Sequence, residues 1–544
     1  MTAARPAAAL LACALALGAR AAPPALFTTS DRCSSCHNGL TTKAGGDVSI
    51  GIAWRASIMA NSARDPYWQA AVSREIADHP TVRANIEDEC ATCHMPMSRF
   101  EAHAAGRTGQ IFAHLPFGPR GNPQDRLAED GVSCALCHSI EDAKLGTRES
   151  YDGGFVVDTS RRPGDRPVYG PFAVEAGLDR VMHSATGFRP IQSQHVKRSE
   201  LCATCHTLFT PTFRNGEKIG ELPEQMPYVE WLHGAFRDVQ SCQDCHMPKP
   251  ATPAPIASVL GPVHEDFREH TFPGANFFML GMLDRYRAEL DVAALPSELG
   301  LARTGTLAFL RDAAARISVQ ARPGKRGTVE AEVSVENLTG HKLPTAYPSR
   351  RVWIHLLVKD ARGRTIFESG RLNDDGSIAG NDNDADPRAY EPHHQRITRP
   401  DEVQIYEPIL AAPDGTITTG LLTAVRYAKD NRLLPAGFDK ATAPPEIAVV
   451  GGAATDPEFR GGGHRVLYVV PLGAAVAPLK VEAELWFQPI GFRWAMNHTF
   501  YQQAESQRFV GWYREMSGST GTRLAAASAV VQRVRGARPP ARRR

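Results

Sequence analysis

The sequence lacks three features that would place it in a simple class: an excess of one charge, a dense set of cysteines, and a long apolar segment after its first residues. The 544 residues carry 61 Lys+Arg and 59 Asp+Glu, a formal net charge of +2, which gives no reason to expect a nucleic-acid partner. Eleven cysteines are too dilute for a small disulfide scaffold. With 42% hydrophobic and 22% charged residues, the chain as a whole is neither disordered, nor collagen, nor a coiled coil.

Residues 1–21 have the pattern of a secretory signal peptide. A weakly positive start at Arg5 precedes an apolar run over 7–19, and residues 19–21 read Ala-Arg-Ala, a cleavage pattern. The run is too short to cross a bilayer, which takes about 20 residues, and no later segment is long enough, so we expect no transmembrane helix. Residues 10–13 loosely resemble a lipoprotein box, which leaves lipidation at Cys13 open. The pattern predicts export.

The other ten cysteines all fall in five copies of Cys-x-x-Cys-His. The copies are Cys33/Cys36/His37, Cys90/Cys93/His94, Cys134/Cys137/His138, Cys202/Cys205/His206 and Cys242/Cys245/His246. This spacing is the attachment signature of c-type haem, in which two thiols bind the porphyrin and the adjacent histidine ligates the iron. Structural zinc would couple such pairs in fours and needs no histidine after each pair, and disulfides would not require five repeated local pairs. The sequence therefore predicts five c-type haems.

A low-spin electron-transfer haem needs a second axial ligand, for which other histidines are candidates. The region of the motifs contains His79, His103, His114, His183, His195, His233, His264 and His270. Local context favours His103, His183, His195 and His270 as distal ligands, with His233 a weaker candidate. His264 and His270 are six residues apart and do not share a helix face, so we expect only one of them to ligate. Weaker alternatives are Met59, Met95 and Met97.

Two regions with different sequence patterns make up the predicted fold. Residues 27–285 hold all five motifs at irregular spacing, which predicts short, irregular helices around a core filled by porphyrins. One helix should begin at about Pro66, with Asp65 as its N-cap. The proline-rich stretch 248–262 indicates an extended connector. Residues 277–293 and 298–317 have helical spacing of apolar positions, which makes 286–317 a helical connector.

Residues 318–525 contain no cysteine and favour strands. The stretch 328–337 alternates strictly, 351–370 suggests two strands joined by a turn, and 465–472 and 479–488 are further strands. Several short strands of this kind predict an all-β, sandwich-like domain. The basic, proline-interrupted end, residues 526–544, is predicted to be a disordered tail.

The β-rich region contains candidate ligands of its own. His341 lies in the loop-like stretch NLTGHKLPTAYPS and could ligate a haem iron across the domain boundary. Asp382, Asp384 and Asp386 alternate along the chain, so their carboxylates could converge on Ca²⁺, although a polar Asx turn explains them as well. The neighbouring pair His393-His394 is more typical of a solvated pair than of a metal site.

The motifs and the segments around them, such as SIMANSARDPYWQA, GVSCALCH, SELCATCH, SCQDCHMP and HTFPGAN, resemble exported bacterial multihaem c-type cytochromes. They are similar to the tetrahaem cytochromes of nitrifying bacteria and their superfamily, over residues 30–280, and a β-domain with a GHKLPT segment resembles one appended to some members. The resemblance implies electron transfer through stacked, mostly bis-His haems, with His195 and His270 as distal ligands. Five motifs in place of four is a departure that leaves the stacking order open.

These observations favour an electron carrier at the periplasm or the outer cell surface of a bacterium. Its expected partners are other cytochromes or a quinol-oxidising membrane complex, and oligomers are possible. One alternative is an oxidoreductase in which one iron stays open to a small nitrogen or sulfur oxyanion, although the Cys-x-x-Cys-Lys variant that resembles multihaem nitrite reductases is absent. A second alternative is a subunit of a polymeric haem wire.

Overall fold

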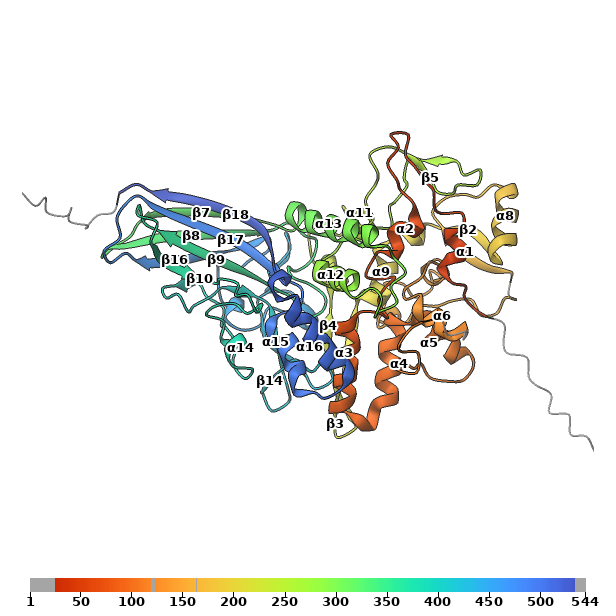
Figure 1. Cartoon of the computed structure of the whole chain (residues 1–544), viewed down its shortest axis with the longest axis horizontal. Coiled ribbons are helices and arrows are strands. Elements are labelled where there is room, and N and C mark those ends of the chain that lie inside the picture. Colours follow the sequence, from red (N-terminus) through yellow and green to blue (C-terminus); the bar gives the residue numbers. More distant parts are fainter. Residues whose placement is uncertain (1–24, 119–122, 163, 534–544) are drawn as a thin grey trace, which may run out of the picture.

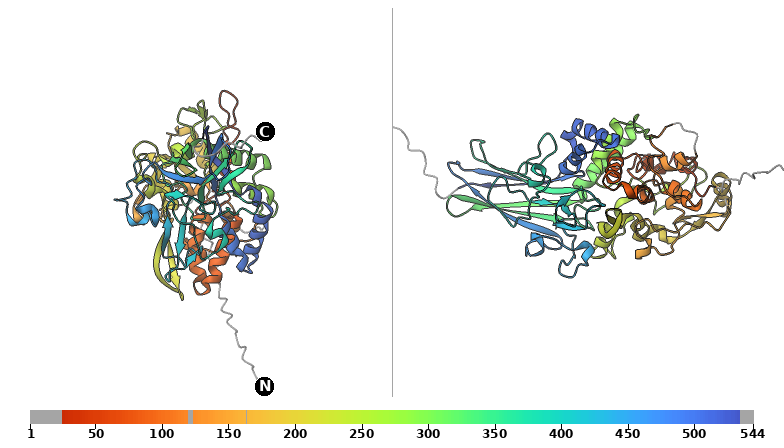
Figure 2. Two further views of the ribbon diagram at one scale, coloured as in Figure 1. Left: turned by 90° about the vertical axis from the view of Figure 1, so that its left-hand side faces the viewer. Right: turned by 90° about the horizontal axis from the view of Figure 1, so that it is seen from below.

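The computed structural model describes residues 25–118, 123–162 and 164–533. The predicted signal peptide, Cys13 and residues 534–544 lie outside this part of the chain. Two halves lie side by side along the long axis, the motif-bearing half in red to yellow and the β-rich half in green to blue (Figures 1 and 2). Within the described residues, no helix is both long and apolar enough to cross a membrane.

The motif-bearing half consists of short helices joined by long irregular segments. Its helices are α1 (Ser30–Ser34), α2 (Ile50–Arg55), α3 (Pro66–Asp78), α4 (Arg83–His94), α5 (Pro96–Ala104), α6 (Pro123–Glu129), α7 (Cys134–Cys137), α8 (Ala176–Thr186), α9 (Ser199–His206), α10 (Pro227–Leu232) and α11 (Cys242–His246). Three two-stranded sheets complete this half: β1 (Arg166–Gly170) with β2 (Phe188–Gln192), β3 (Leu208–Arg214) with β4 (Glu217–Gln225), and β5 (Ala254–Pro255) with β6 (Val263–His264). Four motifs lie on α4, α7, α9 and α11, and the first begins on α1.

Helix α3 begins where the sequence predicts. Pro66 is its first residue, and the Asp65 carboxylate accepts hydrogen bonds from the backbone amides of Tyr67 (2.8 Å) and Trp68 (3.1 Å). These bonds satisfy amide groups that have no partner within the helix. The cap also fixes the direction in which Tyr67 and Trp68 leave the helix, and both side chains line the cavity described below.

Two helices lead into the β-rich half, α12 (Phe277–Arg285) and α13 (Pro296–Ala313). The helical prediction for 298–317 is wrong at its end, because strand β7 (Ala315–Pro323) starts two residues after α13. Residues 315–323 pair along their full length with β8 (Thr328–Asn337), so sheet hydrogen bonds replace the helical pattern there. The sheet β11-β16-β8-β7 is completed by β11 (Arg396–Ile397) and β16 (Gly463–Pro471).

A second large sheet faces the first. Its order is β10-β9-β17-β18, with β12 beside β9; the bounds are β9 (Arg351–Lys359), β10 (Thr365–Ser369), β12 (Ile405–Tyr406), β17 (Leu479–Gln488) and β18 (Thr522–Val531). Buried side chains of both sheets, including Val333 and Val466 of one and Ile354 and Leu485 of the other, belong to one hydrophobic cluster. Two mainly antiparallel sheets that share a core in this way form a sandwich; of their described strands, only β11 runs parallel to its neighbour, β16. A smaller sheet contains β13 (Pro408–Ala411), β14 (Ile417–Thr418) and β15 (Arg426–Asp430).

The end of the β-rich half differs from the prediction in two respects. Strand β18 continues to Val531 and pairs with β17, so residues 526–531 are sheet and not tail. Helix α16 (Ala504–Glu515), which follows α14 (Asp382–Ala385) and α15 (Phe492–Met496), packs against α3 of the other half, and the two are neighbours in Figure 1. Phe509 of α16 lies 5.0 Å from Tyr67 between ring centroids. The two halves are therefore joined by side-chain packing as well as by the connector.

Candidate haem-binding cavity

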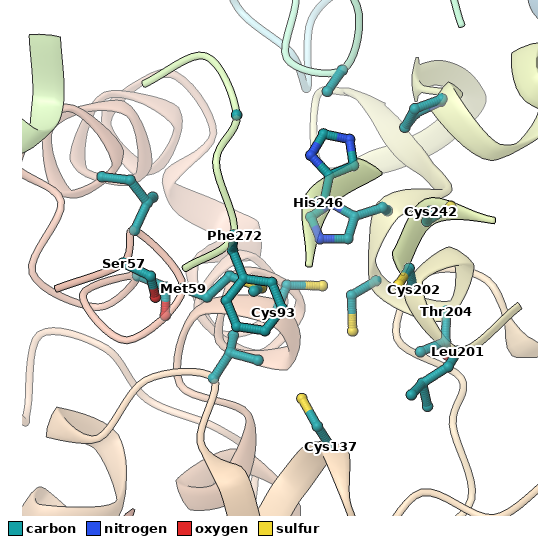
Figure 3. A pocket seen from close by; sticks show the side chains of 18 of the residues that line it. Ser57, Met59, Cys93, Cys137, Leu201, Cys202, Thr204, Cys242, His246 and Phe272 are labelled. Atoms are coloured by element: carbon teal, nitrogen blue, oxygen red, sulfur yellow. The ribbon is translucent and has the colours of Figure 1, made fainter. Parts of the chain in front are cut away.

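One cavity of about 1640 Å³ runs through the motif-bearing half. An ordinary small-molecule pocket has roughly 300–1,000 Å³, so this space suits several ligands or one very large one. Nine of the ten motif cysteines line it, all except Cys36. Figure 3 shows the sulfur atoms of Cys93, Cys137 and Cys202, from three different motifs, directed into the same space. No disulfide forms among these cysteines.

The motif histidines are held in the orientation that iron ligation requires. In four of the five, Nδ1 donates to a backbone carbonyl: His37 to Ile256 (2.5 Å), His94 to Ser62 (2.9 Å), His138 to Tyr169 (2.6 Å) and His246 to Pro273 (2.7 Å). This bond fixes the tautomer and leaves Nε2 unprotonated, as in metal-bound histidines generally. Desolvation by the surrounding protein lowers the pKa of His94 and His206 to about 4, so both rings are neutral and can ligate a metal.

Two further histidines lie opposite motif histidines. His270 and His138 have ring centroids 6.4 Å apart with an interplanar angle of 23°, and His341 and His246 have centroids 6.4 Å apart at 10°. Two iron–nitrogen bonds of about 2 Å, with each nitrogen about 1.1 Å from its ring centre, put the ring centres of an axial pair about 6.2 Å apart. Nδ1 of His270 donates to the Arg268 carbonyl (3.0 Å) and Nδ1 of His341 to that of Lys342 (2.9 Å). The centroid distances of both pairs therefore match the distance expected for two imidazoles on one iron.

The structure does not place the other predicted distal ligands in the cavity. His195 is buried, but Nδ1 is bonded to the Ser193 hydroxyl (2.7 Å) and Nε2 to the Ile140 carbonyl (2.8 Å), so it has no free nitrogen. Nε2 of His103 is bonded to Asp88 (2.7 Å), and the side chain is 39% exposed. The remaining two are His183, whose Nε2 is bonded to the Gly164 carbonyl, and His233, which is exposed after α10. All four predictions are corrected for the same reason: their rings face other protein groups or solvent.

The weaker candidate ligands also differ in whether they line the cavity. Met59 lines the cavity, whereas Met95 and Met97 are fully buried in hydrophobic clusters and do not line it. Nδ1 of His114 is bonded to Asp125 (2.6 Å). His264 stacks on Phe172, a cavity-lining ring, with centroids 3.9 Å apart. Among the described residues the cavity is lined by seven histidines: the five of the motifs, His270 and His341.

The motifs contact one another in an order that differs from the sequence order. The Cys33 and Cys134 thiols lie close enough for Cys134 to lower the pKa of Cys33, which brings motifs one and three together. In the same way Cys93 raises the pKa of Cys205, which brings motifs two and four together, and Cys242 raises that of Cys202, which brings motifs four and five together. Cys137 of motif three is close enough to Cys202 and Cys205 to interact electrostatically. Motif four therefore lies at the centre of the set.

A thiol pair, an Nδ1-fixed histidine and a large shared cavity match the donor set of c-type haem, so the residues fit that group. No protein-family model and no curated protein matches the sequence. The fold is similar to that of a solved structure: a penta-heme cytochrome c552 from Thermochromatium tepidum superposes with a TM-score of 0.54 at 16% identity, covering 93% of this chain and 99% of the other. The chain has the fold of a penta-haem cytochrome. The match includes both halves, since it extends over nearly the whole of each chain. The similarity to tetrahaem cytochromes of nitrifying bacteria stays a prediction.

The cavity of this cytochrome fold contains one cation without an acidic partner among the described residues. The Arg350 guanidinium donates to the Thr345 carbonyl (2.9 Å) and the Asn276 side-chain oxygen (3.1 Å), both neutral. Burial lowers the pKa of Arg350 to about 10. The rings of Tyr67 and Tyr347 also lie on the cavity wall, with centroids 5.7 Å apart. This part of the cavity would attract an anion, such as a haem propionate or a bound oxyanion.

The predicted calcium site is not formed. Both carboxylate oxygens of Asp384 are bonded to the buried Arg351 guanidinium, at 2.7 and 2.9 Å. Asp386 pairs with the exposed Arg388 (3.2 Å), and Asp382 is exposed on the other side of the short helix α14. Because an arginine already neutralises the central carboxylate, the three aspartates do not converge on a cation, and the Ca²⁺ prediction is wrong.

The neighbouring histidine His393 is not a solvated residue. Nε2 of His393 and Nε2 of His464 both donate to one oxygen of Asp456, at 2.9 and 3.0 Å, in the only cluster of potential metal ligands among the described residues. The amide nitrogens of Gln404 and Asn431 both face His393 Nδ1 at 3.1 Å, so Nδ1 accepts and Nε2 carries the proton. A protonated Nε2 cannot ligate a metal. The group is a hydrogen-bonded network of the β-rich half.

Proposed function

We propose that this protein is an exported electron carrier that binds five c-type haems through its five Cys-x-x-Cys-His motifs. The observation that carries the proposal is the pair of facing imidazoles, His138 with His270 and His246 with His341, in a cavity lined by the motif cysteines. When bound, each haem supplies one reversible one-electron centre. The chain would hold the irons with histidines that line one shared cavity.

The thiol contacts suggest the path. The pKa shifts of the thiols place motif one near motif three, motif three near motif four, and motif four near both motif two and motif five. Electron transfer becomes steeply slower with distance, so porphyrins attached to touching thiols exchange electrons fastest. We infer a branched path that enters or leaves at motif one and at motifs two and five, with motif four as the branch point.

Covalent haem attachment is tested on the protein secreted from a host with a c-type haem assembly system. We expect a band that keeps its haem stain after denaturing electrophoresis and a mass increase equal to five haems. We also expect an α-band typical of c-type haem on reduction. A protein without covalent haem, or with fewer haems than motifs, would contradict the proposal.

A second candidate, an oxidoreductase, is favoured by the histidine count. Seven cavity-lining histidines provide two facing pairs and leave the irons of His37, His94 and His206 without an opposite histidine among the described residues. Arg350 adds a cation suited to a nitrogen or sulfur oxyanion, and it interacts electrostatically with His206. Electron paramagnetic resonance of the oxidised protein, and nitrite or sulfite added to the reduced protein, decide between the two. High-spin iron that binds the anion supports the enzyme; an all-low-spin protein that binds nothing supports the carrier.

Partners and location follow from the same proposal. A carrier of this kind exchanges electrons with other cytochromes or a quinol-oxidising membrane complex, in the periplasm or at the outer cell surface. The two facing histidine pairs form within one chain, so ligation at these sites does not require a second copy, as a polymeric wire with exchanged ligands would.

A further inference from the structure

The loop that carries His341 is held by a buried cluster of four charged side chains. Lys342, Asp430 and Arg432 belong to the β-rich half, and Glu230 belongs to α10 of the motif-bearing half. Their side chains are between 0% and 3% exposed. Two cations and two anions make the cluster neutral, and each charge has an opposite charge within 3.0 Å, which is the condition for burying charged groups.

Lys342 is fixed at three points. Its backbone amide donates to Glu230 Oε2 (3.0 Å), its ammonium group donates to Asp430 Oδ2 (2.7 Å), and its carbonyl accepts the Nδ1 proton of His341 (2.9 Å). The last bond sets the ring orientation of His341, because it determines which nitrogen faces His246. The position of Lys342 therefore decides the position of the imidazole.

Glu230 connects this arrangement to the other half of the molecule. Its Oε2 also accepts from the Thr345 hydroxyl (2.5 Å), and its Oε1 pairs with Arg432 (3.0 Å), which in turn is bonded to Asp430 (2.8 Å). Helix α10 packs against α9, the helix that carries the fourth motif. The same carboxylate thus holds both ends of the segment 342–345 against the motif-bearing half.

We propose that the Glu230–Arg432–Asp430–Lys342 cluster is an interdomain latch that positions His341 as the sixth ligand of the iron bound by His246. The inference rests on the axial pair assigned in the proposed function. It gives the β-rich half a function, which is to supply one axial ligand to the set of haems. Glu230 is a positioning residue, since it acts through Lys342 and Thr345 and does not itself face the iron.

The test uses carbon monoxide binding and the spin state of the reduced, haem-loaded protein. His341→Ala should bind about one more CO per chain than the wild type, because it leaves the sixth position of one iron open. Glu230→Gln keeps the shape of the side chain but removes its negative charge. We expect it to bind CO at the same haem, in an amount between the wild type and His341→Ala, with a matching increase in high-spin signal. Thr345→Val removes a single hydrogen bond to Glu230 and should give a smaller change of the same kind, which keeps the test possible if Glu230→Gln does not fold.

Asp384→Asn is the matched control. It breaks another buried ion pair of the β-rich half, Arg351 with Asp384, whose side chains are 4% and 3% exposed. It should lower thermal stability without adding CO binding. If Glu230→Gln or Thr345→Val lowers stability but binds no more CO than the wild type, the cluster only stabilises the fold and the latch is overturned. If His341→Ala itself adds no CO site, the axial assignment fails instead.

Discussion

At the scale of single residues, the nitrogen that is left free distinguishes ligands from structural histidines. His195 is buried and His270 is half-buried, and the sequence around each favours both as ligands. His270 donates from Nδ1 to the Arg268 carbonyl and its ring lies 6.4 Å from that of His138 between centroids, whereas both nitrogens of His195 are bonded within the protein. Hydrogen bonding to a particular carbonyl, rather than proximity in the chain, therefore selects the ligand.

This difference predicts opposite outcomes for two alanine variants. His270→Ala should convert one haem to a high-spin form that binds CO, since it removes the group opposite His138. His195→Ala should leave the visible and EPR spectra as in the wild type and lower stability only. The spectra of the two purified haem-loaded proteins check this directly. A CO-binding His195→Ala protein would restore His195 as a ligand and contradict the assignment.

At the scale of elements, the ends and contacts of α3 show how helices position the cavity wall. Its N-cap orients Tyr67 and Trp68, and Trp68 lies parallel to the His94 ring with centroids 4.3 Å apart. On its other side α3 packs against α16 from the far end of the chain. One helix thus links a motif histidine to the C-terminal half.

The cap can be tested separately from the packing. Asp65→Ala removes two hydrogen bonds to backbone amides and should lower the free energy of unfolding by about 1 kcal/mol. Asp65→Asn keeps an oxygen that accepts from Tyr67 and Trp68 and should cost much less. Urea unfolding followed by circular dichroism measures both. Equal losses in the two variants would show that the carboxylate charge, and not the cap, is what matters.

Breaking the contact between α3 and α16 should lower the stability more than removing the cap. Phe509 is fully buried, and its truncation to alanine should cost about 3–5 kcal/mol, through lost burial and a cavity beside Tyr67. Phe500 lies nearby in the sequence but is 70% exposed, so Phe500→Ala is the control and should change stability very little. Thermal unfolding of both proteins checks the expectation. A stable Phe509→Ala protein would mean that α16 is not needed to hold α3.

At the scale of the whole molecule, charge and shape are set jointly by the chain and its expected haems. Removal of residues 1–21 would delete Arg5 and Arg20 and leave 59 basic and 59 acidic side chains, a formal charge of zero. Five haems add ten propionates and five ferric centres with about +1 each, so the holoprotein is near −5 when all propionates are ionised. A nearly neutral chain becomes an anionic carrier.

The sign of that charge predicts how salt affects electron uptake. Reduction by a cationic complex such as hexaammineruthenium(II) should become slower as ionic strength rises, because salt screens the attraction. Reduction by anionic dithionite should become faster, since the same screening weakens a repulsion. Stopped-flow traces at low and high salt measure both. The same salt effect with both reductants would contradict a net negative surface.

Local sequence by itself predicts the covalent chemistry and determined much of the secondary structure. A Cys-x-x-Cys-His motif needs only five adjacent residues, so His37, His94, His138, His206 and His246 were recognisable without a fold. The Asp65 cap and the alternation in 328–337 are equally local, and α3 and β8 form where they were predicted. Only the tertiary structure decided the rest, because distal ligation joins residues far apart in the chain. His341 meets His246 through a latch between the two halves, and Asp384 of α14 forms an ion pair with Arg351 of β9. Neither contact can be predicted from the spacing of residues in the sequence.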